Sequence, residues 1–372
     1  MNAHITIRKL NHQRLLYVYP DPSRVSGDAV SQAPWELVEL AHAHSLFEPV
    51  DRPGRPRIAD ELWIDMPLLK GWYSECKGNH HVCRHETAGA DAIASSEEPA
   101  SVRLLLVDTH NDGLISGSTA SQYVASSYIW GKANSFVTTK KRLKQLKRPG
   151  ALAQTPESKF LLPKTVAQAM QVTKAVEQRY LWVDAVCIVQ DGDDKNDQLV
   201  SMAEIYAGAA LTIIDAEAED AECGFRVLNG ISGPRTLKQS YAPINSDYAP
   251  MRPGSKQVWD ESHQRTSTRG WCYQEDLFSR RKIVFAANSV RWHCRSARWS
   301  EESNSSDCTA THGTAGQQQV NQWSSERLFT SPLPTLAEYE ALVNGFNGRM
   351  FTYPEDAYDA FAGILTHLSS KL

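Results

Sequence analysis

The stretch Tyr-Val-Ala-Ser-Ser-Tyr-Ile-Trp-Gly, residues 123–131, opens the most regularly patterned part of the sequence. It holds mainly apolar, aromatic and small residues and ends at a glycine, so it predicts a strand over 123–129. Apolar runs of strand length follow at 181–188, 211–215 and 282–286. Nearly continuous apolar runs are typical of parallel strands that are covered on both faces. The runs therefore predict a buried, mainly parallel sheet.

Amphipathic stretches separate these runs, as crossover helices would. Apolar or small residues recur at helical spacing after Pro163, at Val166, Ala169, Met170, Thr173 and Val176. A second helix is predicted over 196–207 and a further strand over 290–294. The alternation predicts an α/β fold, a doubly wound sheet with helices on both faces. Ligands of such sheets bind outside the carboxyl ends of the strands, where the sequence places Ser126, Ser127, Asp184 and Asp215.

The composition is that of an ordinary globular protein, with 41% hydrophobic residues in a chain of 372. A formal net charge of −4 gives no global attraction to nucleic acid or to anionic membranes. No apolar run reaches the ~20 residues that a membrane helix needs. The seven cysteines are odd in number, which fits reduced thiols better than a disulfide framework. We therefore expect a cytoplasmic protein with no membrane or nucleic-acid partner.

Polar tracts predict the domain organisation. The small-polar stretch at 86–101 closes an N-terminal extension, residues 1–101, which also holds a cluster of cysteine and histidine residues. The organised domain is predicted over 102–300. A polar loop then begins the C-terminal part, residues 301–372, which ends in a helical pattern.

The end of the chain allows two interpretations. Its final residues, Ser370-Lys371-Leu372, match a peroxisomal address, which gives the alternative location. However, a helix is expected from near Glu355, and nothing after Ser369 resembles a helix stop. The apolar side of this helix would hold Phe361, Ile364, Leu365 and Leu368. We therefore expect a truncated helical region, in which the tripeptide is accidental.

Strong catalytic signatures are missing. The sequence has no G-x-G-x-x-G, Walker loop, H-E-x-x-H or G-x-S-x-G motif, which removes the main support for a dehydrogenase, an NTPase, a zincin or an α/β-hydrolase. The acidic stretch at 191–197 lacks the glycine and the terminal glutamate of a calcium loop, so a solvated helix start is the better interpretation. The basic run at 140–148 could contact phosphates, but without interleaved aromatic residues it is better interpreted as a solvated helix face.

One short segment combines the residue types that bind zinc. Cys76, His80 and Cys83 follow each other as Cys-x3-His-x2-Cys, with His81 and His85 beside them. This spacing is not that of a standard zinc finger, and cysteine is also a common small buried residue. We therefore assign no metal site from the sequence and keep zinc at Cys76, His80 and Cys83 as the alternative.

The segment 268–285 contains the carboxylate of greatest interest, Glu275. It lies a few residues before an apolar strand, between Trp271 and a basic cluster. A glutamate in this position can simply pair with Arg280 or Arg281, which at a surface contributes only ~0–1 kcal/mol. The local pattern alone favours this ion pair.

Three segments, in order, resemble the fungal heterokaryon-incompatibility (HET) domain family. The first is the stretch at 123–131, the second is Arg-Tyr-Leu-Trp-Val-Asp-Ala-Val-Cys-Ile-Val-Gln-Asp at 179–191, and the third is Arg-Gly-Trp-Cys-Tyr-Gln-Glu at 269–275. Ser126 departs from the leucine that is usual in the family. The resemblance implies a role in fungal non-self recognition and programmed cell death. It also implies homo-oligomerisation on activation and an unidentified non-self sensor or ligand as partner.

HET domains are in turn similar to TIR domains, which implies a flavodoxin-like parallel sheet. Some TIR domains hydrolyse NAD with a glutamate that follows a Trp-Cys-like pair, as Glu275 follows Trp271-Cys272 here. The resemblance thus implies an NAD nucleosidase with NAD as substrate, no cofactor, and Glu275 as the catalytic residue. The implied substrate-binding residues are Ser127, Tyr128, Trp130, Gly131, Asp184, Gln190 and Trp271. The alternative is a non-enzymatic signalling module that self-associates, in which the Trp, Cys and Gln residues belong to the core.

Overall fold

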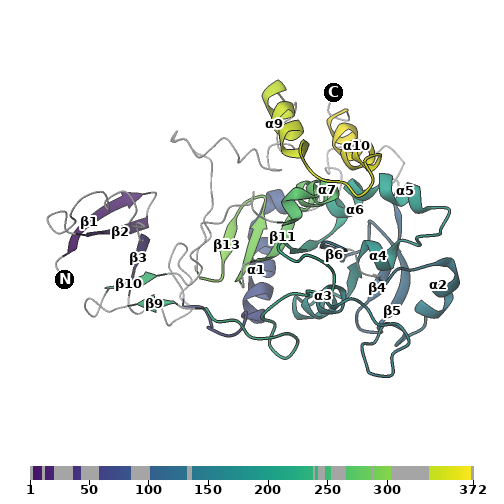
Figure 1. Ribbon diagram of the computed structural model, residues 1–372, viewed down its shortest axis with the longest axis horizontal. Helices are drawn as coiled ribbons and strands as arrows, with labels where there is room; N and C mark the ends of the chain where they lie inside the picture. Colours follow the sequence, from purple (N-terminus) through teal and green to yellow (C-terminus); the bar gives the residue numbers. More distant parts are fainter. Residues whose placement is uncertain are drawn as a thin grey trace.

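The protein is described by a computed structural model (Figure 1). The described residues are 3–10, 13–20, 37–42, 58–84, 101–131, 136–237, 239–241, 248–252, 265–286, 289–302 and 335–369. Two sheets are present in these ranges. The terminal tripeptide 370–372, residues 86–100 of the predicted linker and the polar tract at 303–319 lie outside the described residues.

The smaller sheet has five strands in the order β1-β2-β3-β10-β9. Its N-terminal strands are β1 (Ala3–Leu10), β2 (Gln13–Pro20) and β3 (Leu37–His42). Two strands from much later in the chain complete it, β9 (Ser240–Tyr241) and β10 (Tyr248–Arg252). Neighbouring strands of this sheet pair antiparallel, and Figure 1 shows the sheet at one end of the molecule, beside the larger sheet.

The larger sheet has eight strands in the order β13-β12-β11-β8-β6-β7-β4-β5. Its strands are β4 (Arg103–Asp108), β5 (Gly113–Ser118), β6 (Tyr123–Ser127), β7 (Tyr180–Trp182), β8 (Leu211–Asp215), β11 (Arg281–Ala286), β12 (Ser289–Cys294) and β13 (Arg298–Ser300). The four central strands β11, β8, β6 and β7 pair in parallel. Their chain order across the sheet, second-first-third-fourth, is the order of a flavodoxin-like sheet.

The edges of this sheet differ from the prediction. β4 pairs antiparallel with both β5 and β7, and β12 pairs antiparallel with β11 and β13. The predicted parallel arrangement is therefore confirmed for the central strands, whereas a mainly parallel sheet is wrong for the whole. The physical reason is the connections: β4–β5 and β11–β12 are joined by short turns, which can link only antiparallel neighbours.

The apolar run at 181–188 is only partly a strand, which corrects the prediction. β7 ends at Trp182, and the chain then makes one helical turn, α4 (Asp184–Cys187). Residues 181–183 and 185–188 are all buried. The apolar run therefore indicates a buried segment but does not indicate an extended backbone. A short apolar run cannot by itself distinguish a buried strand from a buried helical turn.

Helices cover both faces of the large sheet. Figure 1 shows α3 (Lys164–Ala175) on one side of β6, with α6 (Met202–Gly208) and α7 (Gly270–Phe278) on the other. α1 (Met66–Asn79) packs against α3 and β12, and α10 (Asp356–Ser369) packs against α7, α6 and α5 (Lys195–Val200). The remaining helices are α2 (Lys140–Leu146), α9 (Leu336–Phe346), and the 3-10 turns η4 (His81–Cys83) and η6 (Arg265–Thr268).

The helix predictions are confirmed with two differences. The helix expected over 196–207 is two helices, α5 and α6, separated at Ser201. The C-terminal helix forms and buries Ile364 and Leu368, but Leu365 is 39% exposed and does not face the core. α2 carries exposed lysines, and α5 begins within the acidic stretch, at Lys195, as the solvated interpretations of both segments expect.

The core lies between the sheet and these helices. Its four largest fully buried side chains among the described residues, Trp182, Trp292, Tyr123 and Tyr206, come from the sheet and from α6. Trp182 and Tyr206 pack edge to face with their ring centroids 5.6 Å apart. Aromatic pairs of this kind contribute about 0.5–1.5 kcal/mol beyond the area that they bury. This core holds α6 and α7 on one face of β6, where the candidate site lies.

Candidate functional site

Glu275 is held between α7 and the large sheet. It is 6% exposed, and the Ser127 hydroxyl at the carboxyl end of β6 donates a hydrogen bond to its Oε2 atom at 2.5 Å. Ser279, one helical turn later, bonds to Thr212 of β8 at 2.7 Å, so this face of α7 is fastened to two neighbouring parallel strands. The location agrees with the edge where ligands of such sheets bind.

Asp184 lies close enough to Glu275 to interact with it electrostatically. Its Oδ2 atom accepts a hydrogen bond from Trp130 Nε1 at 2.8 Å, and its Oδ1 accepts from the Ala185 backbone at 2.7 Å. The helical turn α4, which the sequence did not predict, is what turns this carboxylate back toward the end of β6.

Burial controls the ionisation of both carboxylates. Burial, reinforced by the charge of Asp184, raises the pKa of Glu275 to about 7, against the Ser127 hydrogen bond and the positive charge of Arg269. Burial likewise raises the pKa of Asp184 to about 6, and its hydrogen bonds from Ala185 and Trp130 oppose this rise. Both pKa values therefore lie near neutral pH, and carboxylates with pKa values raised in this way are often found at functional sites.

Two tyrosines complete the surroundings of Glu275. The Tyr206 hydroxyl donates to the Ser126 carbonyl at 3.1 Å. Tyr128 is 6% exposed, and its hydroxyl has no hydrogen-bond partner among the described residues. Burial raises the pKa of Tyr128, and the charges of Asp184 and Glu275 raise it further, which places the ring near both carboxylates. A buried donor without a partner costs about 1–3 kcal/mol unless a water or ligand satisfies it.

The ion pair that the local pattern favoured does not form. Arg281 donates to Cys76 Sγ and to the Ala210 carbonyl, and Arg280 lies near the Ala209 carbonyl. The cation on this segment that does pair with a helix carboxylate is Lys282, whose Nζ lies 2.7 Å from Asp276 Oδ1. The simple surface interpretation of Glu275 is therefore wrong.

Three of the predicted binding residues have other neighbours. Trp271 donates from Nε1 to Asp356 at 3.2 Å, so its indole faces the start of α10. The Gln190 side chain donates from Nε2 to the Ile188 carbonyl at 3.5 Å, and the Gln190 backbone donates to the Thr138 carbonyl at 2.9 Å. Gly131 has φ +76°, and a Cβ there would lie 2.2 Å from Asp220 Cβ, so glycine is required by backbone packing. The structure brings together Ser127, Tyr128, Trp130, Asp184 and Glu275.

A separate cavity of about 420 Å³ lies at the carboxyl ends of β8 and β11. Asp215, Phe285 and Arg265 are among its lining residues, and Glu275 is not. Asp215 is 5% exposed, its Oδ2 has no hydrogen-bond partner among the described residues, and burial raises its pKa to about 7. The sequence marked Asp215 as a polar strand end but not as a site residue.

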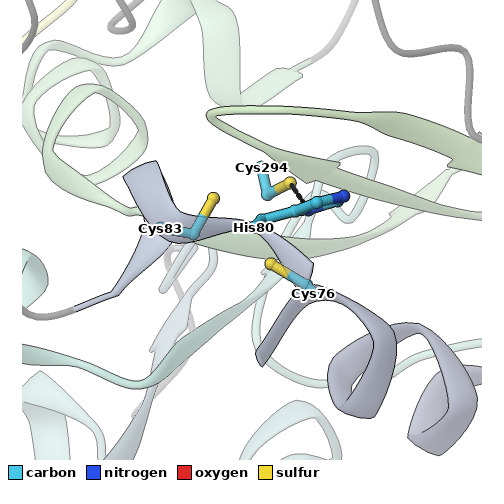
Figure 2. Close-up of side chains that lie close together, drawn as sticks. All are labelled: Cys76, His80, Cys83 and Cys294. Atoms are coloured by element: carbon cyan, nitrogen blue, oxygen red, sulfur yellow. Dashed lines mark hydrogen bonds between the residues drawn. The ribbon is translucent and has the colours of Figure 1, made fainter. Parts of the chain in front are cut away.

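The three zinc-type residues lie in a separate cluster. Cys76, His80 and Cys83 come together, and a fourth residue, Cys294 of β12, joins them (Figure 2). The motif spacing did not predict Cys294 as a ligand, because Cys294 lies 214 residues from His80 in the sequence. Its assignment to the same site depends on where β12 ends and not on any local spacing.

Comparison with known families identifies the part of the chain that contains Glu275. Residues 123–275 match the family described as heterokaryon incompatibility protein (HET). These residues form a HET domain. No curated protein and no solved structure matches the chain. None of the described helices is long and apolar enough to cross a membrane.

The bounds of the HET match agree with the geometry of the site. The match begins at the first residue of β6, spans β7, α4 and β8, and ends at Glu275. It therefore contains both partners of the Ser127–Glu275 hydrogen bond and the Trp130–Asp184 hydrogen bond. The antiparallel edges β4–β5 and β12–β13 lie outside it.

Proposed function

We propose that this HET domain acts in heterokaryon incompatibility as a cell-death effector that hydrolyses NAD at the nicotinamide–ribose bond, with Glu275 as the catalytic carboxylate. The observation that carries the proposal is the placement of Glu275 against Ser127, beside Asp184, at the carboxyl end of β6. In an α/β sheet with this strand order, the carboxyl ends of the central strands are the expected place for a nucleotide ligand.

The reaction suits a site with one principal carboxylate. The C1′–N bond breaks, nicotinamide leaves as a neutral base because its ring nitrogen is cationic in NAD, and the oxygen of a water attacks C1′. No general acid is needed for the leaving group, unlike ordinary glycosides. Ionised Glu275 stabilises the positive charge that develops on the ribose. It also accepts a hydrogen bond from a ribose hydroxyl or takes the proton of the attacking water.

Neighbouring residues have positioning roles in this scheme. Ser127 orients the Glu275 carboxylate and favours its charged form through its hydrogen bond. The unpartnered Tyr128 hydroxyl is a donor for a substrate oxygen, and the Trp130 indole, held by Asp184, is a stacking face for a ring. The cavity at the ends of β8 and β11, the strands that follow β6 across the sheet, is the space that we propose for the rest of the dinucleotide.

Access to Glu275 requires a conformational change, because the side chain is 6% exposed. Trp271 and Gln274 of α7 lie against the C-terminal segment: Trp271 bonds to Asp356, and Gly363 of α10 approaches the Gln274 amide. We propose that homo-oligomerisation on activation moves the C-terminal segment away from α7 and so admits NAD. The isolated chain is then expected to be a weak enzyme, and the assembled chain a strong one.

The test is an NAD-consumption assay on the full chain over a wide range of protein concentration. We expect concentration-dependent release of nicotinamide by the wild type, a fall of at least ~100-fold for Glu275→Gln, and little change for Asp276→Asn, the exposed neighbour on the same helix. Asp215→Asn distinguishes the role of Asp215 from that of Glu275, since the substitution alters the cavity and leaves Glu275 intact.

The competing function is a module that signals by self-association without catalysis, which the deep burial of Glu275 favours. Expression of the wild type and Glu275→Gln in fungal cells distinguishes the two functions. Cell death that persists with the Gln variant, together with no NAD loss by the assembled wild type, would establish the non-enzymatic function.

A further inference from the structure

We infer that Cys76, His80, Cys83 and Cys294 form a structural zinc site that fastens α1 to the end of the large sheet. The potential ligand atoms of these four residues all lie within 4.8 Å of one another. Figure 2 shows the side chains converging from different elements, Cys76 from the last turn of α1, Cys83 from η4 and Cys294 from β12.

The separations suit a tetrahedral ion. Zinc–sulfur and zinc–nitrogen bonds of about 2.3 and 2.0 Å imply ligand-to-ligand edges of roughly 3.5–3.8 Å. Cys294 Sγ lies 3.3 Å from His80 Nδ1, and the longest separation is 4.8 Å. Rotation about the Cα–Cβ bonds of the cysteines absorbs differences of about 1 Å. Three soft sulfur ligands and one imidazole are a set that favours zinc over magnesium or calcium.

The charges around the cluster suit a metal thiolate centre. Three thiolates and a neutral imidazole around Zn²⁺ carry a net charge of −1. Arg281 is 6% exposed, and its Nε donates to Cys76 Sγ at 3.2 Å. Arg280, beside it, is also 6% exposed. A buried guanidinium is costly unless an opposite charge lies nearby, and the thiolates of a zinc centre supply that charge.

The burial of the ligands indicates a structural and not a catalytic site. Cys76 and Cys83 are fully buried, and Cys294 is 7% exposed. All four coordination positions come from the protein, so no position remains for water or substrate. The half-buried His80 packs against the buried Trp299, with their ring centroids 5.5 Å apart.

The site joins parts of the chain that local structure cannot hold together. Cys76, His80 and Cys83 precede the HET match, and Cys294 follows it. Zinc at this point therefore links the N-terminal extension to β12, one strand beyond the parallel centre of the sheet. The metal stabilises the frame around the HET domain independently of any activity at Glu275.

The first experiment measures zinc in the full chain, purified with reductant and without chelator. We expect about one zinc per chain, and X-ray absorption of the wild type should show three sulfur ligands and one nitrogen ligand. This measurement needs no variant and therefore does not depend on the folding of one. A wild type that lacks zinc and takes up none from added zinc salt overturns the inference.

The second experiment compares ligand variants. Cys294→Ser and His80→Ala should lose most of the zinc and unfold at a lower temperature, whereas His80→Cys should retain it, because four thiolates still form a zinc site. Cys223→Ser is the matched control, since Cys223 is exposed and lies outside the cluster. Unchanged zinc content in Cys294→Ser, or a disulfide between two of the three cysteines in the wild type, contradicts the site.

Discussion

The Ser127 hydroxyl on β6 donates a hydrogen bond to Glu275 on α7, across 148 positions of sequence. Both residues are buried, at 3% and 6% exposure. The bond favours the charged carboxylate, while burial and Asp184 oppose it, and the pKa of Glu275 rises to about 7. The environment of this single pair therefore decides whether Glu275 is charged at neutral pH.

Replacing Glu275 by Gln should stabilise the protein at pH 8 and change little near pH 4. Glutamate ionises near pH 4.5 in the unfolded chain, and Glu275 ionises near pH 7 in the folded chain. Glu275 therefore contributes its full stability to the folded state below about pH 4.5, and this contribution is lost as the pH rises through about 7. Gln does not ionise and avoids a loss of up to about 3 kcal/mol. Urea unfolding at several pH values checks this, with Asp276→Asn as control. Equal differences at every pH would show that Glu275 does not titrate in this range.

The rate of NAD cleavage should rise as pH increases through about 7 and then level off, because the proposed mechanism uses ionised Glu275. Ser127→Ala removes a hydrogen bond to the charged form, which raises the pKa of Glu275 and should move the midpoint of the profile upward. Initial rates of nicotinamide release across pH 5–9 measure both profiles. A rate that falls over this interval would mean that the protonated acid is the active form.

Arg235→Ala should destabilise the protein by about 3–5 kcal/mol, because it leaves a buried carboxylate without its partner. Arg235 and Glu301 form an ion pair whose side chains are 0% and 2% exposed, and Arg235 also donates to the Asp60 and Trp63 carbonyls. Arg265→Ala is the comparison, since the Arg265–Glu219 pair is more than half exposed. It should cost under about 1 kcal/mol. Urea denaturation of both variants measures the two losses in the free energy of unfolding. Similar losses would show that burial does not set the contribution of these ion pairs.

Gly131→Ala should be more destabilising than Gly150→Ala. Both glycines have positive φ, +76° and +78°, so each substitution carries a backbone cost of about 1–2 kcal/mol. Only at Gly131 does the new Cβ collide, at 2.2 Å from Asp220 Cβ, whereas nothing lies within 4 Å at Gly150. Thermal unfolding of the two variants gives the difference. Equal shifts would show that the Asp220 loop moves aside freely.

How well each element of the fold was predicted depended on whether a pattern of adjacent residues encodes it. The strands at 123–127, 211–215 and 281–286 and the helix α3 follow from apolar runs and from helical periodicity, and all are present. The strand predicted at 181–188 is mainly the turn α4, because burial on every side produces the same apolar run as a parallel strand. The antiparallel edge β4–β5 was not predicted, although its residues lie within the range assigned to the domain.

The candidate site was predictable in its members more than in its contacts. The motif resemblance selected Glu275, Ser127 and Asp184, which the structure brings together. It also selected Trp271 and Gln190, whose hydrogen bonds lie elsewhere, because a motif identifies neighbours in sequence but not the direction of a side chain. Asp215 and its cavity depend on how the loops after β8 and β11 meet, which no local pattern encodes.

By itself, the sequence determined the positions of three of the four central parallel strands, the helices that cross between them and the resemblance to the HET family, since apolar spacing and short motifs are properties of adjacent residues. Only the tertiary structure decided which distant groups meet. Strand order places Ser127 beneath Glu275, and the end of β12 brings Cys294 to Cys76, His80 and Cys83. Such contacts join residues more than 100 positions apart, and their chemistry arises from burial and charge that exist only after the sheet has formed.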